Sequence, residues 1–189
     1  YILSSVEDIS EQKKAELELL QSESRFRKIF SNTFVGIVIN RLLKNDLGKA
    51  VDFLHIDANS SVKKHLGADP EQIIGKLASQ LVSSKETEYM TRLNEEVVKT
   101  GKPYHIERHF ADFNKTLELS AFHLEGDLFV STFIDITDRK EASIELQNSE
   151  NKFRALVEQS LTGIYIFEQD NFLYVNKRFC EIFGYTEEE

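Results

Sequence analysis

The sequence contains no tryptophan, one methionine and one cysteine, Cys180, among its 189 residues. A single cysteine has no partner within the chain, so an internal disulfide is excluded, and this usage is typical of a reducing compartment. Proline is also scarce, with 2 residues, which argues against a collagen-like or Pro-rich disordered chain. From the cysteine usage we expect a cytoplasmic protein.

Long apolar runs and basic stretches are missing as well. The longest mostly apolar stretch, residues 128–134, is far shorter than the roughly 18 residues of a membrane span, so we expect no membrane contact by this chain. This expectation does not exclude a membrane anchor elsewhere in the parent protein. The net charge is -9 without any run of Lys and Arg, so nucleic acid is not an expected partner. The 14 phenylalanines and 41% hydrophobic residues instead indicate a globular fold.

An internal repeat organises the chain. Residues 4–39 recur as residues 131–166 at an offset of 127, and 14 of the 36 aligned positions are identical. At this spacing the chain holds one complete copy between two partial ones. We expect the C-terminal strand of an upstream module at 1–10, a linker helix at 11–24, a complete central module at 25–137, a second linker helix at 138–152 and the N-terminal part of a downstream module at 153–189.

The central copy has the sequence pattern of an α+β fold. Gly126 lies in a tight connection that favours a hairpin between the last two predicted strands. Asn59 is suited to cap a short helix, and a capping-box pattern follows at 69–72. The predicted strands are 35–40, 52–58, 104–110, 116–124 and 128–136, and the predicted helices begin at 60, 70 and 85.

Each linker segment carries a narrow apolar seam at the a and d positions of a heptad pattern. Two interpretations stay open: the seams pair in a parallel homodimer, or each helix docks on its own module, since about two and a half heptads are short for a coiled coil. Ser10 and Thr137 are suited to cap the two helices. The seam residues are Gln12, Ala15, Leu19, Ser22, Phe26 and Ile29, and then Arg139, Ala142, Leu146, Ser149, Phe153 and Leu156.

Several sequence blocks resemble those of tandem PAS domains. The resemblance covers essentially the whole chain, because the blocks occur in the right order twice. It implies a PAS fold, with a five-stranded antiparallel sheet in order 2-1-5-4-3 and short helices on one face over a cavity that can hold a small ligand. The blocks are DITDRK at 135–140, SENKFR at 149–154, GI at 163–164, YVN at 174–176 and FGY at 183–185, with central counterparts at 52–53, 57–59, 66–67 and 73–76.

The resemblance also implies a role in signalling. Members of this family lie upstream of histidine kinases, diguanylate cyclases or similar output domains and pass a signal along the connecting helices. An output domain in the same parent chain and a second copy of the protein are therefore expected partners. The expected relay residues are Asp8, Ile9, Ser10, Leu19, Phe26, Asp135, Ile136, Thr137, Leu146 and Phe153.

Catalytic motifs are missing from the sequence. It has no Gly-rich phosphate loop, no paired Cys or His at metal-ligand spacing and no nucleophile elbow. It also has no GGDEF-like loop and no His followed directly by an acidic residue, as phosphoaccepting helices usually have. We therefore expect no enzymatic activity from this chain and assign no catalytic residue.

No cofactor is positively indicated, and its identity stays unknown. PAS haem sensors usually ligate iron through a His on the longer helix, and residues 85–99 contain none. Light-sensing relatives form a flavin adduct through a cysteine that follows the Ile-Gly-Lys-like block, whereas Cys180 lies in the earlier helix. His55 and His65 are expected to be solvated. A weak metal motif alternates along one strand at His105, Glu107 and His109, and we assign no metal to it.

A small-molecule pocket in the central copy is the remaining candidate site. Alternation along the strands predicts which apolar side chains face the helices. These side chains either fill a dry core or line a cavity, and a cavity requires polar groups that converge on it. The apolar candidates are Ile37, Ile39, Leu54, Ile56, Leu117, Leu119, Phe129 and Phe133, and the polar candidates are Tyr89, His123 and Ser131.

Taken together, these patterns predict a non-enzymatic sensory and signal-relay module. It is expected to sense a small molecule or a partner and to pass the signal through its connecting helices to a downstream output domain. The alternative is a ligand-free spacer that serves structure or dimerisation. A third class, a haem- or flavin-bearing redox or gas sensor, has less support.

Overall fold

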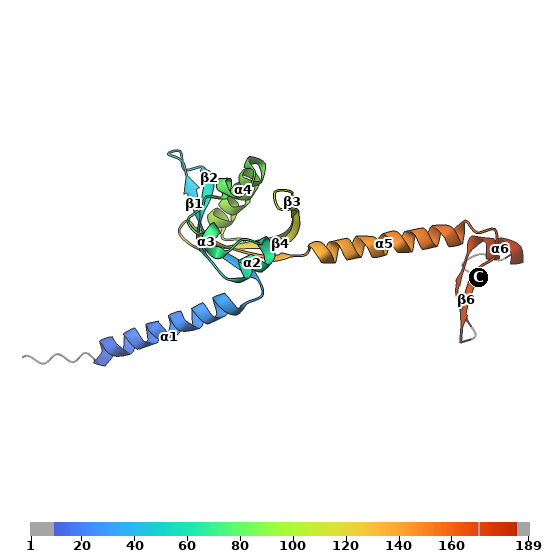
Figure 1. Cartoon of the computed structure of the whole chain (residues 1–189), viewed down its shortest axis with the longest axis horizontal. Helices are drawn as coiled ribbons and strands as arrows, with labels where there is room; N and C mark the ends of the chain where they lie inside the picture. The colour runs from blue at the N-terminus through green and yellow to red at the C-terminus, as the bar shows by residue number, and fades with distance from the viewer. Residues whose placement is uncertain (1–9, 170, 185–189) are drawn as a thin grey trace, which may run out of the picture. The chain divides into compact units, whose positions relative to one another are not determined.

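The computed structural model describes residues 10–169 and 171–184 (Figure 1). These residues fall into two compact units, one ending at Ile136 and the other beginning at Thr137. The predicted upstream strand, with the relay residues Asp8 and Ile9, lies outside the described residues except for Ser10, where the first helix begins.

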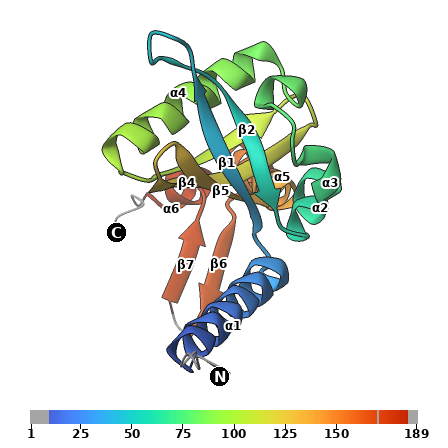
Figure 2. The same cartoon turned by 90° about the vertical axis from the view of Figure 1, so that its left-hand side faces the viewer.

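A five-stranded antiparallel sheet forms the centre of the first unit. Its strand order is β2-β1-β5-β4-β3, so the order 2-1-5-4-3 is confirmed, as is the α+β class (Figure 2). The hairpin at Gly126 is also confirmed, because β4 pairs with β5 and Gly126 has a φ of 52°. The strands are β1 (Gly36–Lys44), β2 (Ala50–Ala58), β3 (Tyr104–Phe110), β4 (Lys115–Glu125) and β5 (Leu128–Asp135).

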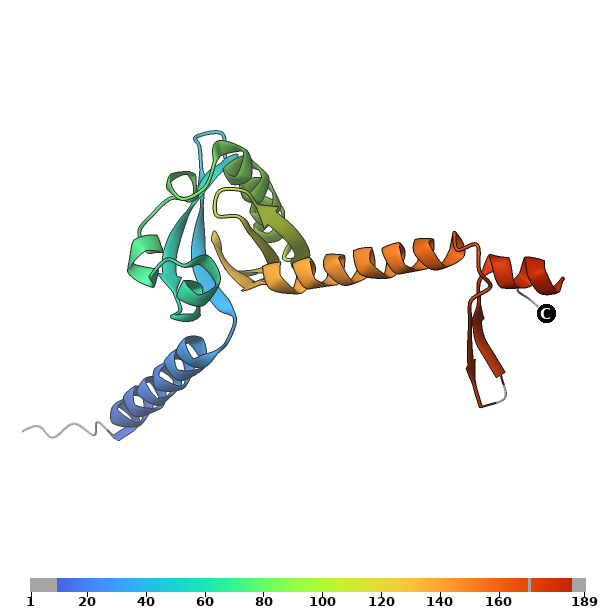
Figure 3. The ribbon, with the colours of Figure 1, turned by 45° about the vertical axis from the view of Figure 1, so that its right-hand side comes forward.

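Short helices and one longer helix pack on one face of this sheet (Figures 2 and 3). The capping box is confirmed: the backbone N–H of Asp69 donates to Oε1 of Gln72 at 2.8 Å. Gly67 and Gly101 end their helices in the left-handed conformation, which costs glycine little because it has no Cβ. The helices are α2 (Ser61–Leu66), α3 (Pro70–Ile73), the 3-10 turn η1 (Ala78–Gln80) and α4 (Ser84–Thr100).

The predicted inward faces of β1 and β2 are wrong. Ile37 and Ile39 are only half-buried, whereas the alternate positions Val38 and Asn40 are buried. The sequence did not distinguish the two faces of β1 because apolar side chains occupy both, and a polar residue, Asn40, takes an interior position. The same reversal applies to β2, where Phe53 and His55 point inward and Leu54 and Ile56 lie on the opposite face.

The inward faces predicted for β4 and β5 are confirmed. Leu117 and Leu119 are buried on β4, and Phe129 and Phe133 are buried on β5. Phe129 is fully buried and packs edge-on against Phe53, with the ring centroids 5.6 Å apart. These side chains form the core between the sheet and its helices.

One long helix precedes the sheet and another begins the second unit. Helix α1 (Ser10–Asn32) leads to β1, and α5 (Thr137–Glu158) follows β5 in the chain. Both include the predicted linker segments and extend beyond them. The second unit continues with the hairpin β6 (Tyr165–Glu168) and β7 (Asn171–Val175) and with helix α6 (Lys177–Phe183).

Candidate functional site

A cavity of about 210 Å³ lies in the first unit between the inward face of the sheet and the helices. Of the eleven sequence candidates, four line it: Leu117, Leu119, Ser131 and Phe133. Phe129 is buried in the core beside it. Apart from Asn40 and His55, the remaining wall is apolar and comes from residues that were not among the sequence candidates, including Val38, Phe53, Leu66, Ile73, Met90 and Phe110.

Three polar side chains form one corner of this cavity, which we call the polar corner: Asn40 on β1, His55 on β2 and Ser131 on β5. Nδ1 of His55 lies 2.6 Å from Oδ1 of Asn40. Nδ2 of Asn40 donates to Oγ of Ser131 and to the carbonyl of Val38, each at 3.1 Å. The corner is therefore a connected network on three neighbouring strands.

His55 is neutral at physiological pH in this environment. Burial lowers the pKa of its imidazole to about 4, because the charged form loses its hydration, and the negative charge of Asp52 offsets only part of this effect. The expectation of a solvated His55 is therefore wrong. The sequence did contain an indication that His55 points inward, because alternation places it on the same face of β2 as Phe53.

His123 and Tyr89 lie outside the cavity wall. On the β4–β5 hairpin, Nε2 of His123 lies 2.9 Å from the carbonyl oxygen of Gly126. Tyr89 is covered by the guanidinium of Arg108, 3.8 Å from its ring centroid, and Arg108 in turn donates to Glu86 at 2.7 Å. Both residues thus have partners within the protein.

The weak metal motif on β3 has strand neighbours as partners. Nδ1 of His105 lies 2.8 Å from Oγ of Ser120, and Nδ1 of His109 lies 3.3 Å from Oγ1 of Thr116. Among the described residues, no group of three or more His, Cys, Asp or Glu is arranged to hold a metal ion. Cys180 is buried in α6 of the second unit.

The sheet is joined to α1 through Asn59, at the end of β2. Its Nδ2 donates to the carbonyls of Phe30 at 2.9 Å and Val35 at 2.8 Å, and its Oδ1 accepts from the N–H of Ile37 at 2.9 Å. The side chain was predicted to cap the next helix, and it instead binds the chain between the last turn of α1 and β1. We call residues 30–37 the junction segment.

The start of α2 holds the same junction segment. The hydroxyl of Ser60 donates to the carbonyl of Ser31 at 2.9 Å, and that of Ser61 donates to the carbonyl of Thr33. Together with Asn59, these side chains occupy four backbone carbonyls around the end of α1. The end of this helix is thus held by hydrogen bonds from Asn59 and from the start of α2.

His65 links the junction segment to the end of β5. It is buried, contrary to the expectation from the sequence. Its Nε2 lies 2.6 Å from the carbonyl of Phe34, and its Nδ1 accepts from the N–H of Asp135 at 3.1 Å. Because a carbonyl only accepts, Nε2 carries the proton in this arrangement. His65 thereby connects Phe34, which follows α1, with Asp135, which lies two residues before the start of α5.

The second unit repeats the asparagine arrangement. Nδ2 of Asn176 donates to the carbonyls of Val157 at 2.8 Å and Thr162 at 3.1 Å, and Oδ1 accepts from the N–H of Ile164 at 2.8 Å. These partners stand at the sequence positions of Phe30, Val35 and Ile37 in the repeat. The position of His65 is occupied by Ile182, so its link has no counterpart there.

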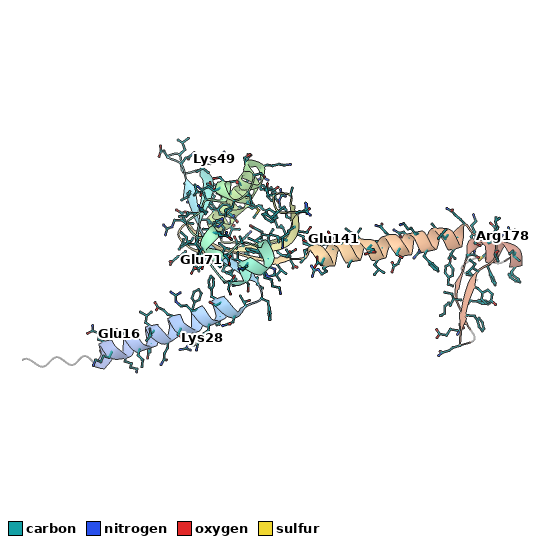
Figure 4. All side chains as sticks on the ribbon, in the orientation of Figure 1. Glu16, Lys28, Lys49, Glu71, Glu141 and Arg178 are labelled. Atoms are coloured by element: carbon teal, nitrogen blue, oxygen red, sulfur yellow. The ribbon has the colours of Figure 1, made fainter. Side chains whose placement is uncertain are left out.

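The relay residues on the helices are mainly exposed. The exposed fractions are 62% for Leu19 and 53% for Phe26 on α1, and 63% for Leu146 and 66% for Phe153 on α5. Figure 4 shows labelled side chains of α1, Glu16 and Lys28, projecting from the helix. The described helices include none that is long and apolar enough to cross a membrane.

The remaining relay residues lie where β5 passes into α5. Oδ2 of Asp135 accepts from Lys115 at 2.5 Å. Ile136 is buried, and its N–H donates to the carbonyl of Thr116 at 2.9 Å. Thr137 is the first residue of α5. This stretch is therefore anchored to β4 up to the beginning of the helix.

Comparison with known proteins identifies the family. One PAS domain model matches residues 49–138 and another matches residues 151–189. Sporulation kinase E of Bacillus subtilis (strain 168) is 27% identical over 203 residues, covering 100% of this chain and 25% of that protein. The chain thus spans about a quarter of the length of this curated relative.

Solved structures are also similar, at lower identity. The PAS domain of a protein from Colwellia psychrerythraea is 21% identical with a TM-score of 0.48, over 64% of this chain and 98% of that one. A domain of a sensory box sensor histidine kinase/response regulator from Geobacter sulfurreducens is 18% identical with a TM-score of 0.49, over 62% and 96%. With two PAS models that together match more than half of its residues, and with the strand order described above, the chain belongs to the PAS domain family of sensory signal-transduction modules.

Proposed function

We propose that the central module, residues 25–137, binds a small molecule in its cavity and passes the resulting change to the helices on either side. The observation that carries this proposal is the combination of an apolar wall with one connected polar corner. Ligand sites typically combine a mostly apolar lining with a few polar groups that fix orientation. A core filled only for stability has no need of a polar network around a buried Asn40, since polar groups lose hydration on burial.

The proposed route out of the cavity runs through β5 and α2. Ser131 in the polar corner and Asp135 at the link with His65 lie on the same strand, four residues apart. His65 and Asn59 connect that strand and β2 with the junction segment. A small displacement at Ser131 would therefore pass along β5 to Asp135, and from there through the hydrogen bonds of His65 to Phe34 in the junction segment.

For the whole protein we propose a histidine kinase output in the same chain, located in the cytoplasm and working as a homodimer. The likeness to a sporulation kinase over the entire chain supports the kinase output. The exposed seam residues of α1 and α5 support self-association, because apolar side chains at heptad spacing are typically covered by a partner helix. No catalytic step is assigned to this chain, whose family matches are to sensory modules.

Ligand binding is tested by native mass spectrometry of freshly purified chain, followed by a thermal-shift screen of metabolites. We expect a retained or added small molecule that raises the melting midpoint, because a ligand that binds only the folded state stabilises it by mass action. An absorption spectrum of the same sample separates a haem or flavin group from a colourless ligand. A protein that retains nothing and is stabilised by nothing in a broad screen would be the structural spacer instead.

A further inference from the structure

The hydrogen bonds of the polar corner fix which atom each group offers to the cavity. The carbonyl of Val38 only accepts, so the amide nitrogen of Asn40 faces it and the amide oxygen faces His55. Nδ1 of His55 therefore carries the proton and donates to Asn40. Because the ring is neutral, Nε2 has no proton and is a hydrogen-bond acceptor.

Ser131 offers the complementary group. Its oxygen accepts from Asn40, which leaves its own hydroxyl proton able to donate to a molecule in the cavity. The cavity wall thus presents one acceptor, on His55, and one donor, on Ser131, on neighbouring parts of its polar corner.

Charged molecules fit this wall poorly. Among the described residues, no Lys, Arg, Asp or Glu lines the cavity, so neither an anion nor a cation finds a counter-charge in this wall. The carboxylate of Asp52, which is not part of the lining, acts electrostatically on His55 and so disfavours an anion at the polar corner. An ion entering this space loses hydration that no opposite charge in the described wall replaces.

We infer that the cavity selects an uncharged, mainly apolar molecule with a hydroxyl-type group that donates to Nε2 of His55 and accepts from the hydroxyl of Ser131. This inference rests on the proposed function, since it names the ligand class for the same cavity. The volume of about 210 Å³ exceeds the roughly 150 Å³ of an engineered cavity that binds benzene, so the ligand is somewhat larger than one ring.

The test uses three probes with the same ring and chain: 2-phenylethanol, its methyl ether and phenylacetate, each titrated into the full chain by NMR. The ether keeps the acceptor oxygen but cannot donate to His55. We expect the alcohol to bind roughly tenfold more tightly than the ether, the value of one good hydrogen bond, and phenylacetate to bind more weakly than either. In His55→Leu the preference for the alcohol disappears while the ether still binds.

His123→Leu is the matched control, because His123 lies outside the cavity wall and its substitution leaves the preference intact. Equal affinity of the unsubstituted chain for alcohol and ether, or tighter binding of phenylacetate, would overturn the ligand class while leaving the cavity as a binding site. Failure of all three probes to bind at millimolar concentration would instead count against the proposed function itself. The comparison of the alcohol with the ether in the unsubstituted chain decides the matter even when His55→Leu does not fold.

Discussion

Two histidines, half-buried His55 and buried His65, show how neighbouring groups determine what a side chain does in this fold. His55 lies beside Asn40 at the cavity, and His65 bridges Phe34 and Asp135 at the ends of the sheet. The sequence analysis predicted that both are solvated, because the local sequence around a histidine does not reveal which groups hydrogen-bond to its ring nitrogens. Asn40 was missed for the same reason. Burial of such groups depends on partners that are distant in sequence, as Asn40 and Ser131 are.

The lowered pKa of His55 predicts a specific dependence of stability on pH. The unfolded chain binds a proton at this side chain near pH 6.5 and the folded chain only near pH 4, so stability is fully present above about 6.5 and falls as the pH drops toward 4. The loss amounts to roughly 3 kcal/mol at the acid end. Urea unfolding of the unsubstituted chain and of His55→Leu across this range measures it.

We expect the unfolding free energy of His55→Leu to fall less between pH 6.5 and pH 4 than that of the unsubstituted chain, by roughly 3 kcal/mol. This difference does not depend on the stability of the variant at pH 7. His123→Leu is again the control, since this residue is on the exposed hairpin, and its pH profile should follow that of the unsubstituted chain. Parallel profiles for the unsubstituted chain and His55→Leu would contradict a neutral His55 in the folded state.

At the scale of elements, local signals predicted much of the fold. The capping box at Asp69, the glycine stops at Gly67 and Gly101 and the hairpin at Gly126 all appear in the structure, because each depends on a few neighbouring residues. The inward faces of β1 and β2 were predicted wrongly. Both faces of β1 are apolar, and on β2 the apolar pair Leu54 and Ile56 was preferred to the face that Phe53 and His55 share. The strand order came from the family resemblance and not from local pattern.

Helix α2 is the element that joins the junction segment to the end of β5, and two substitutions of His65 separate its two contacts. The amide group of an asparagine takes the place of Nδ1 of the histidine, and the amide group of a glutamine takes the place of Nε2. We expect His65→Asn to keep the bond from Asp135 and lose the one to Phe34, and His65→Gln to do the reverse. Amide hydrogen exchange of the full chain measures the outcome.

The predicted difference is at the amide of Asp135. Its exchange should accelerate roughly fivefold in His65→Gln, as for the loss of a hydrogen bond worth about 1 kcal/mol, and stay near the unsubstituted rate in His65→Asn. The amide of Ile164 in the second unit is an internal control, because its bond to Asn176 does not involve His65. Equal acceleration at Asp135 in both variants would indicate a general loosening instead of two separable contacts.

At the scale of the whole molecule, the repeat predicts a chain of modules joined by helices. Asn59 and Asn176 make the same three side-chain hydrogen bonds in the two copies, so each module holds the end of the helix that precedes it in the same way. A helix held at its end can transmit a rotation or a shift to the next module. This duplicated attachment is the structural basis for the proposed relay.

The most direct test of that relay is the phase of α5 in the full-length protein. One residue inserted within 141–149 turns the rest of the helix by about 100°, whereas seven inserted residues restore the original face to within about 20°. The proposed kinase output is measured as autophosphorylation with and without the sensed ligand. Relay through the helix predicts that the one-residue insertion abolishes the response to ligand and the seven-residue insertion retains it. An unchanged response in both proteins would contradict it.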